Sequence, residues 1–117
     1  MPIKSLGYLG VRSNKVDDWK YFAGKVLAMH LADHGGRQLS FRMDDLVQRL
    51  VVSDEPGETL AFIGWEVSKK SDLQYLAAKL DDAGHKVSEG GSELADRRFV
   101  EDLIVCSDPA GNRIELV

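Results

Sequence analysis

The sequence has one cysteine, no long apolar run and no excess of positive charge, and each of these features excludes a class of protein. Cys106 cannot form a disulfide within the chain and has no neighbouring cysteine for a zinc site, so we expect a buried strand residue. No stretch approaches the roughly 20 apolar residues of a membrane-spanning helix. The N-terminus also lacks the apolar segment of a signal peptide. These features predict a cytoplasmic protein with no membrane partner.

The balance of charge argues against a nucleic-acid partner. Lys and Arg number 15 against 19 Asp and Glu, which gives a net charge of −4. Phosphate binding requires a cluster of basic residues, and a pair such as Arg97-Arg98 does not amount to one. The 117 residues, 44% of them hydrophobic, are typical of one soluble domain with its own core. We therefore expect a single domain over 1–117.

An internal repeat is the most informative feature of the sequence. With a shift of 54 residues, YLGV (8–11) lies over FIGW (62–65) and DWKYFAGKV (18–26) lies over DLQYLAAKL (72–80). A repeat of this kind predicts two copies of one structural unit in a pseudo-twofold domain. The first module covers about 1–57 and the second about 58–117.

Each copy is expected to begin with a strand and to continue with an amphipathic helix. In the first copy Asp17 and Asp18 are the expected helix N-cap, and in the second Ser71 or Asp72. The apolar residues at helical spacing are Trp19, Phe22, Ala23 and Val26 in the first copy, and Leu73, Leu76, Ala77 and Leu80 in the second. Gly84 is placed to end the second helix in a left-handed conformation.

Two short strands follow a polar stretch in each copy, and we expect both copies to be βαβββ units. These strands are QLSFRM (38–43) and QRLVVS (48–53), then DLIVCS (102–107) and RIELV (113–117). A shift of 64 superposes them, because the second polar stretch is longer, and it places Val51 over Glu115. A rival shift of 54 would align LVVSDEPG with IVCSDPAG, but the tight turn at 108–111 favours 64.

The chain resembles the vicinal oxygen chelate superfamily. The resemblance lies in the paired units, the start IKSLGYLG, the segment ELADRR and the ending CSDPAGNRIEL. Within it, the chain resembles from end to end the N-terminal domain of type I extradiol catechol dioxygenases, which cleave 2,3-dihydroxybiphenyl and steroid catechols. The resemblance implies an α+β fold in which two paired βαβββ modules form a cup-shaped mixed sheet with helices outside.

The resemblance also implies where a metal would lie in such a cup. The family's metal positions correspond to Tyr8, Val51, Phe62 and Glu115. Extradiol Fe(II) chemistry uses two histidines and one carboxylate, and Glu115 alone is of ligand type here. We therefore expect neither a metal site nor catalytic residues in this chain, with an apolar lining from Val51 and Phe62. The substrate-binding residues stay unknown.

Two functions remain open on this evidence. In the first, the chain is the metal-free scaffold domain of a longer, oligomeric dioxygenase whose C-terminal domain holds the Fe(II) and the acid–base residues. We then expect the 117 residues to be a piece of that enzyme and inactive alone. In the second, the chain is a complete, dimeric protein that binds a small aromatic compound or acts as a glyoxalase-like enzyme.

The other candidate side chains have simpler interpretations. His30 and His34 are four residues apart, as metal ligands on one helix face can be, but we expect exposed loop histidines there. His85 follows the second helix, where an imidazole near the carbonyl end is favourable. The strand and helix aromatics Tyr8, Trp19 and Trp65 are expected in the core. The charged segments 44–49 and 93–98 are expected to be solvated or to contact a sister domain or subunit.

Overall fold

The computed structural model describes residues 2–33, 38–44 and 48–117, and the statements below refer to these residues. The chain divides into a first unit, residues 8–61, and a second unit, residues 1–7 and 62–117. The strands β1 (Ile3–Arg12) and β5 (Thr59–Val67) each contribute residues to both units. No helix in the described part of the chain is long and apolar enough to cross a membrane.

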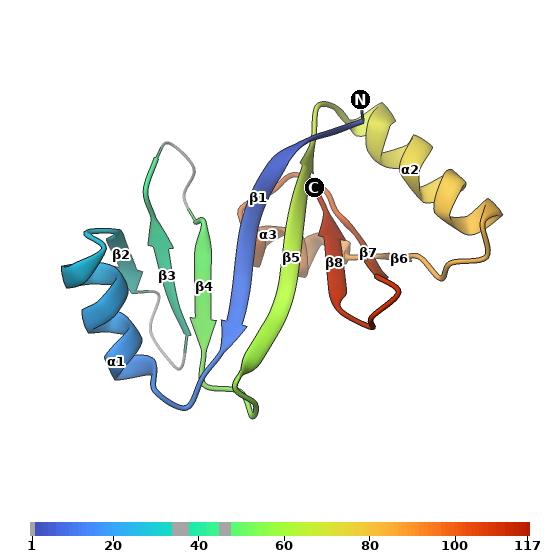
Figure 1. Ribbon diagram of the computed structural model, residues 1–117. Coiled ribbons are helices and arrows are strands. Elements are labelled where there is room, and N and C mark those ends of the chain that lie inside the picture. Colours follow the sequence, from blue (N-terminus) through green and yellow to red (C-terminus); the bar gives the residue numbers. More distant parts are fainter. Residues whose placement is uncertain (1, 34–37, 45–47) are drawn as a thin grey trace. The chain divides into compact units, whose positions relative to one another are not determined.

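The first unit consists of four strands packed against one helical segment (Figure 1). After β1 come α1 (Val16–Tyr21), the π-helical segment η1 (Phe22–Val26), β2 (His30–Asp33), β3 (Gln38–Arg42) and β4 (Leu50–Ser53). The strands are ordered β2-β3-β4-β1, with β1 and β4 parallel and the other pairs antiparallel. The core of the unit consists of Ala23, Leu39, Phe41 and Val52, with Trp19 packed against it.

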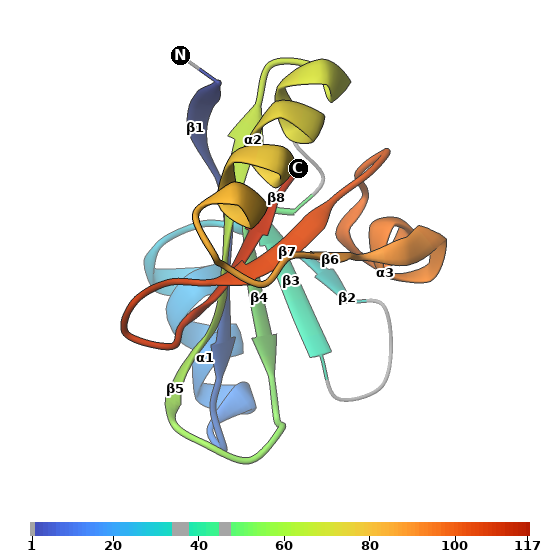
Figure 2. The same ribbon diagram turned by 90° about the vertical axis from the view of Figure 1, so that its right-hand side faces the viewer.

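The second unit repeats this plan and adds a helix. After β5 come α2 (Lys70–Asp82), β6 (Ser88–Glu89), α3 (Gly91–Arg98), β7 (Ile104–Ser107) and β8 (Arg113–Leu116). The strand order is β5-β8-β7-β6, with β5 and β8 parallel. Helix α2 covers one face of these strands (Figure 2), and its apolar stripe packs on Val67, Ile104 and Leu116. All four residues predicted for that stripe belong to this core.

The predicted pair of βαβββ units is confirmed, and so is the shift of 64 for the last strands. In the first unit Leu9 of β1 lies opposite Leu50 of β4, and in the second Ile63 of β5 lies opposite Ile114 of β8. These are the pairings in which Val51 and Glu115 occupy equivalent places. Helix α3, inserted between β6 and β7, accounts for the longer second polar stretch.

The predicted apolar face of the first helix is only half correct. Trp19 and Ala23 contribute to the core, but residues Phe22 and Val26 are 46% and 57% exposed. From Phe22 onward the segment is π-helical, and the Leu27 amide donates to the Phe22 carbonyl five residues earlier. A π-helical turn is wider than an α-helical one, so side chains after Phe22 leave the face that helical spacing predicts.

The predicted N-caps are wrong, whereas the predicted end of α2 is confirmed. The N-cap residues are Lys15 and Lys69, and neither side chain makes a capping hydrogen bond. Asp17, Asp18 and Asp72 lie in the first turns of their helices instead. A negative charge is favourable there because the N-terminal end of the helix dipole is positive. At the other end Gly84 has φ +88°. The amides of Gly84 and His85 donate to the carbonyls of Asp81 and Leu80, which is the Schellman motif.

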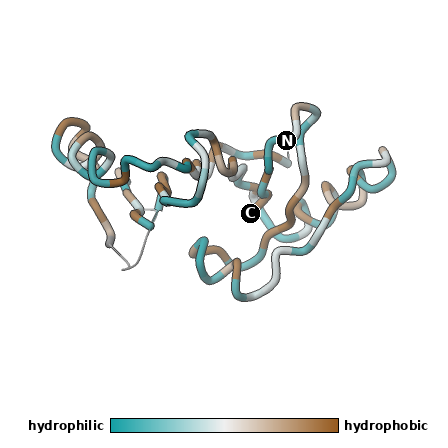
Figure 3. The backbone as a smooth tube through the Cα atoms, turned by 90° about the horizontal axis from the view of Figure 1, so that it is seen from below, coloured by the Kyte–Doolittle hydropathy of each residue, from teal (hydrophilic) through white to brown (hydrophobic). Residues whose placement is uncertain are grey.

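Three short elements, β2, β6 and α3, were not predicted because their sequences lack an apolar period. Strand β2 lies in the stretch expected to be a loop, so His30 is an exposed strand residue, while His34 falls outside the described residues. Helix α3 has few apolar residues, of which Ala95 is buried and Leu94 is partly buried. Figure 3 shows hydrophobic and hydrophilic stretches alternating over short distances, and such short segments give weak periodicity.

Candidate functional site

Glu115 is a fully buried carboxylate in the last strand of the second unit. It lies on β8 between Gly64 of β5 and Val105 of β7, and its side chain is 0% exposed. An ionised carboxylate in such a place is costly unless it is paired and hydrogen-bonded. The partners of Glu115 therefore decide what this position can do.

Two guanidinium groups bind this carboxylate. Arg98 Nε donates to Glu115 Oε1 at 2.8 Å and Arg98 Nη2 donates to Oε2 at 3.1 Å, a bidentate ion pair. Arg113 Nε donates to Oε2 at 3.0 Å from the same strand. Two positive charges thus compensate one buried negative charge, and both carboxylate oxygens are already occupied by donors.

The Arg98 side chain is itself held inside the second unit. It is only 9% exposed, and its guanidinium carbon lies 3.8 Å from the centre of the buried Phe62 ring. A guanidinium at this distance from an aromatic face is stabilised by a cation–π contact. Arg98 is the last residue of α3, so the added helix is what carries this cation to Glu115.

The prediction that 93–98 is a solvated or partner-facing segment is therefore wrong for Arg98. Its neighbour Arg97 is exposed, and no local pattern distinguishes the two arginines. Arg113 was not predicted as a partner of Glu115. A usable signal was present, because residues two apart on a strand lie on the same face.

The other two family metal positions lie in the first unit and are buried. Tyr8 is in β1 and Val51 in β4, where Val51 is opposite Gly10 and Ser40. The burial of Tyr8 agrees with its predicted place in the core. Among the described residues no group of three or more His, Cys, Asp or Glu side chains could hold a metal ion. Together with the paired oxygens of Glu115, this donor set does not fit Fe(II).

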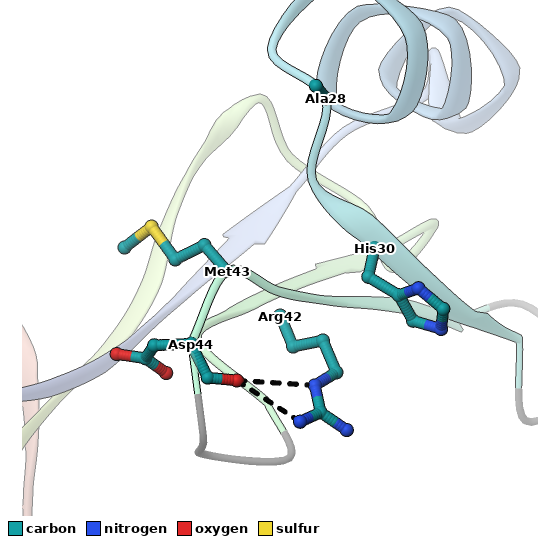
Figure 4. A pocket seen from close by; sticks show the side chains of 5 residues that line it. All are labelled: Ala28, His30, Arg42, Met43 and Asp44. Atoms are coloured by element: carbon teal, nitrogen blue, oxygen red, sulfur yellow. Dashed lines mark hydrogen bonds between the residues drawn. The ribbon is translucent and has the colours of Figure 1, made fainter.

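His30 lines an open cavity of about 360 Å³ in the first unit (Figure 4). The cavity is also lined by Arg42 and Asp44, and Arg42 donates from Nε and Nη2 to the Asp44 carbonyl oxygen. The Asp44 carboxylate binds Arg49. Because Arg49 binds the Asp44 carboxylate and the cation Arg42 shares the lining with His30, the described residues of this cavity do not form a metal site.

The turn between β7 and β8 is organised by Asp108. Its Oδ1 accepts from the amides of Ala110 and Asn112, and its Oδ2 accepts from the Asn112 side chain. These hydrogen bonds, first of all that of the Asn112 side chain, hold the pKa of Asp108 below its ordinary value. The Asp-Pro-x-Gly-Asn stretch is thus a self-contained turn that sets where β8 begins.

The other side chains singled out in the sequence belong to the strands, the helix ends or the core. Cys106 is a buried residue of β7, as predicted, and burial raises the pKa of its thiol. His85 lies just after α2, where its amide completes the end of the helix. Trp19 packs against the core of the first unit, whereas Trp65 is 36% exposed on β5 and its prediction as a core residue is wrong.

Known proteins of one kind resemble this chain. Residues 6–57 match the family model described as "Dihydroxybiphenyl dioxygenase BphC D1". The 3-methylcatechol 2,3-dioxygenase of Pseudomonas putida is 39% identical over 99% of this chain. The biphenyl-2,3-diol 1,2-dioxygenase of Paraburkholderia xenovorans is 36% identical, also over 99% of the chain. The chain spans 40% and 39% of the length of these two relatives.

Solved structures have the same fold. A crystal structure of a catechol 2,3-dioxygenase superposes with a TM-score of 0.94 at 32% identity, over 99% of this chain and 41% of that one. The 2,2',3-trihydroxybiphenyl 1,2-dioxygenase of Sphingomonas wittichii superposes with a TM-score of 0.87 at 28% identity, over 97% of this chain and 40% of that one. The chain therefore has the predicted vicinal oxygen chelate fold and corresponds to the N-terminal part of the extradiol dioxygenases.

Proposed function

We propose that this chain is the non-catalytic N-terminal domain of an Fe(II)-dependent extradiol dioxygenase, an enzyme that opens the ring of a catechol next to its diol. The relatives support this class, since one is a 3-methylcatechol 2,3-dioxygenase and another a biphenyl-2,3-diol 1,2-dioxygenase. A further relative is named an iron-dependent extradiol dioxygenase. The substrate of the whole enzyme is accordingly a substituted or polycyclic catechol from aromatic degradation.

The observation that carries the non-catalytic role is the state of Glu115. At a position where this superfamily places a metal ligand, both oxygens of the carboxylate accept hydrogen bonds from Arg98 and Arg113. Binding of a cation there would require the separation of a buried, bidentate ion pair. The domain then contributes scaffold and interface, while iron and the acid–base residues belong to a C-terminal domain of the same polypeptide.

Oxygen uptake tests this proposal directly. The 117-residue chain would be loaded with Fe(II) without oxygen, mixed with 2,3-dihydroxybiphenyl and exposed to air, while oxygen consumption and the yellow ring-opened product are followed. We expect no turnover from this chain and turnover from the product of the complete reading frame. Ring opening by the 117-residue chain alone would contradict the non-catalytic assignment.

The proposal also has consequences for assembly. We expect the complete enzyme to be a cytoplasmic homo-oligomer, and the isolated chain to self-associate, because a surface that a sister domain normally covers would be exposed. Light scattering over a concentration series measures this. A strictly monomeric isolated chain at high concentration would contradict the expectation.

A further inference from the structure

The helical segment of the first unit, α1 followed by η1, has an exposed face with large apolar residues. The opposite face packs on the core of the unit through Trp19 and Ala23 (Figure 1). On the exposed face, residues Tyr21, Phe22 and Val26 are 65%, 46% and 57% exposed. Large apolar residues that lie together in solvent mark a surface that another molecule covers.

The exposed residues form two rows along the segment. Residues four apart on a helix are neighbours on its surface. In the wider π-helical turn of η1, residues four apart still lie close together, so both rows continue to the end of the segment. All six residues are exposed: Asp17, Tyr21 and Lys25 in the first row, and Asp18, Phe22 and Val26 in the second.

Charge is distributed unevenly along the first row. Asp17 lies in the first turn of α1, Lys25 lies in the last turn of η1, and Tyr21 lies midway between them. Within the part of the chain that the structure describes, neither Asp17 nor Lys25 forms an ion pair. The row is therefore acidic at one end, aromatic in the middle and basic at the other end.

Such a row is complementary to itself in the antiparallel direction. When a second copy lies antiparallel across Tyr21, Asp17 faces the partner's Lys25, and a twofold axis repeats this contact on the other side. In a parallel pair each charge would face its own kind. Antiparallel helix dipoles also place the positive end of one segment beside the negative end of the other.

We propose that this exposed face of α1 and η1 is a self-association surface, and that its occupant is the same face of a second copy of this chain in antiparallel orientation. The inference goes beyond the proposed function, because it names the surface of the expected oligomer and depends on no reaction. Trp19 prepares this surface. Its ring meets that of Phe22 edge-on, with the ring centres 5.8 Å apart, and limits the motion of Phe22.

The size of the surface determines how strong the association is. Segments α1 and η1 contain six and five residues, so together they are roughly 16 Å long. A contact between two such segments is smaller than a standard stable interface. We therefore expect a reversible dimer whose population rises with the concentration of the chain.

Sedimentation velocity over a concentration series tests the charge pairing in the 117-residue chain. Asp17→Lys and Lys25→Asp should each raise the dissociation constant of the dimer at least about tenfold, because two attractive contacts become repulsive. The double variant Asp17→Lys/Lys25→Asp should restore the dimer. An equal mixture of the two single variants should also restore it, since their rows then carry opposite charges.

Three results of this experiment would overturn the inference. They are a monomer at every concentration, which would leave a sister domain as the occupant of this face, a dissociation constant that the single variants do not change, and a failure of the double variant and the mixture to recover the dimer. Circular dichroism of each variant verifies that the exposed substitutions leave the fold intact.

Two exposed tyrosines supply a matched pair of variants for the apolar part of the surface. Tyr21→Ser removes the ring at the centre of the contact and should raise the dissociation constant at least about fivefold. Tyr75 is 53% exposed on α2, so Tyr75→Ser is the control and should leave the dissociation constant unchanged. Equal effects of the two changes would overturn the inference.

The proposed function and this inference fail in different ways. Ring opening by the 117-residue chain would overturn the proposed function and has no bearing on the charge variants. Self-association through a surface that a sister domain normally covers would not respond to the exchange of Asp17 and Lys25. That result would overturn the inference and leave the proposed function intact.

Discussion

Replacement of Arg98 by methionine tests the central ion pair of the second unit. The change keeps an unbranched side chain against Phe62 but removes both hydrogen bonds to Glu115. Removal of one partner from a buried ion pair costs about 3–5 kcal/mol, because the other charge stays buried. Arg113 still donates to the Glu115 carboxylate, so we expect a loss near the lower end, about 3 kcal/mol.

The assay is urea unfolding followed by circular dichroism, with the free energy of unfolding extrapolated to water. Arg12→Met is the matched control, since the ion pair of Arg12 with Glu55 is solvent-exposed and should contribute about 0–1 kcal/mol. The double variant Arg98→Met/Glu115→Met should recover most of the loss, because it removes both members of the pair. A cost for Arg98→Met no larger than that of the control would refute the reasoning.

Three further predictions concern the ends of elements and buried groups. Gly84→Ala should lower the free energy of unfolding by about 1 kcal/mol, because φ is +88° at this position. Gly24→Ala is the control and should be neutral or stabilising, because an added Cβ would meet open space. Equal effects of the two changes in thermal melts would contradict this prediction. The pKa of Asp108 is lower in the folded chain than in the unfolded one, so its contribution to stability is present above the unfolded pKa and is lost as pH falls through the folded pKa. Asn112→Ala should raise that pKa toward its ordinary value in an NMR titration, and an unchanged pKa would disprove the assigned cause. Burial raises the pKa of Cys106, so a thiol reagent at pH 8 should label the native chain at least about tenfold more slowly than the urea-unfolded chain, and equal rates would contradict its burial.

Much of the architecture could be predicted because it depends on local periodicity. The apolar stripe of α2 recurs at helical spacing, and all of its residues reach the core. The equivalence of Val51 and Glu115 followed from one internal alignment, and the pairing of their strands with β1 and β5 agrees with it. Gly84 ends α2 because a residue without Cβ adopts the left-handed conformation at low cost.

The failures have equally specific causes. The π-helical turn at Phe22 breaks the 3.6-residue period on which the prediction of an apolar face relied. Strand β2 has only four residues and pairs with β3 alone, so little in its own sequence marks it. Helix α3 has eight residues and Ala95 is its buried apolar residue, so its sequence carries little helical periodicity.

The sequence by itself determined the repeat, the first strand, main helix and last two strands of each copy, and the place of one carboxylate in the last strand. These features follow from spacing along the chain, which is a local property. Only the tertiary structure decided what that carboxylate binds. Arg98 lies 17 residues from Glu115, and its guanidinium, at the end of α3, contacts both the carboxylate and the Phe62 ring. An ion pair between distant residues depends on how the elements pack, and no pattern of spacing records it.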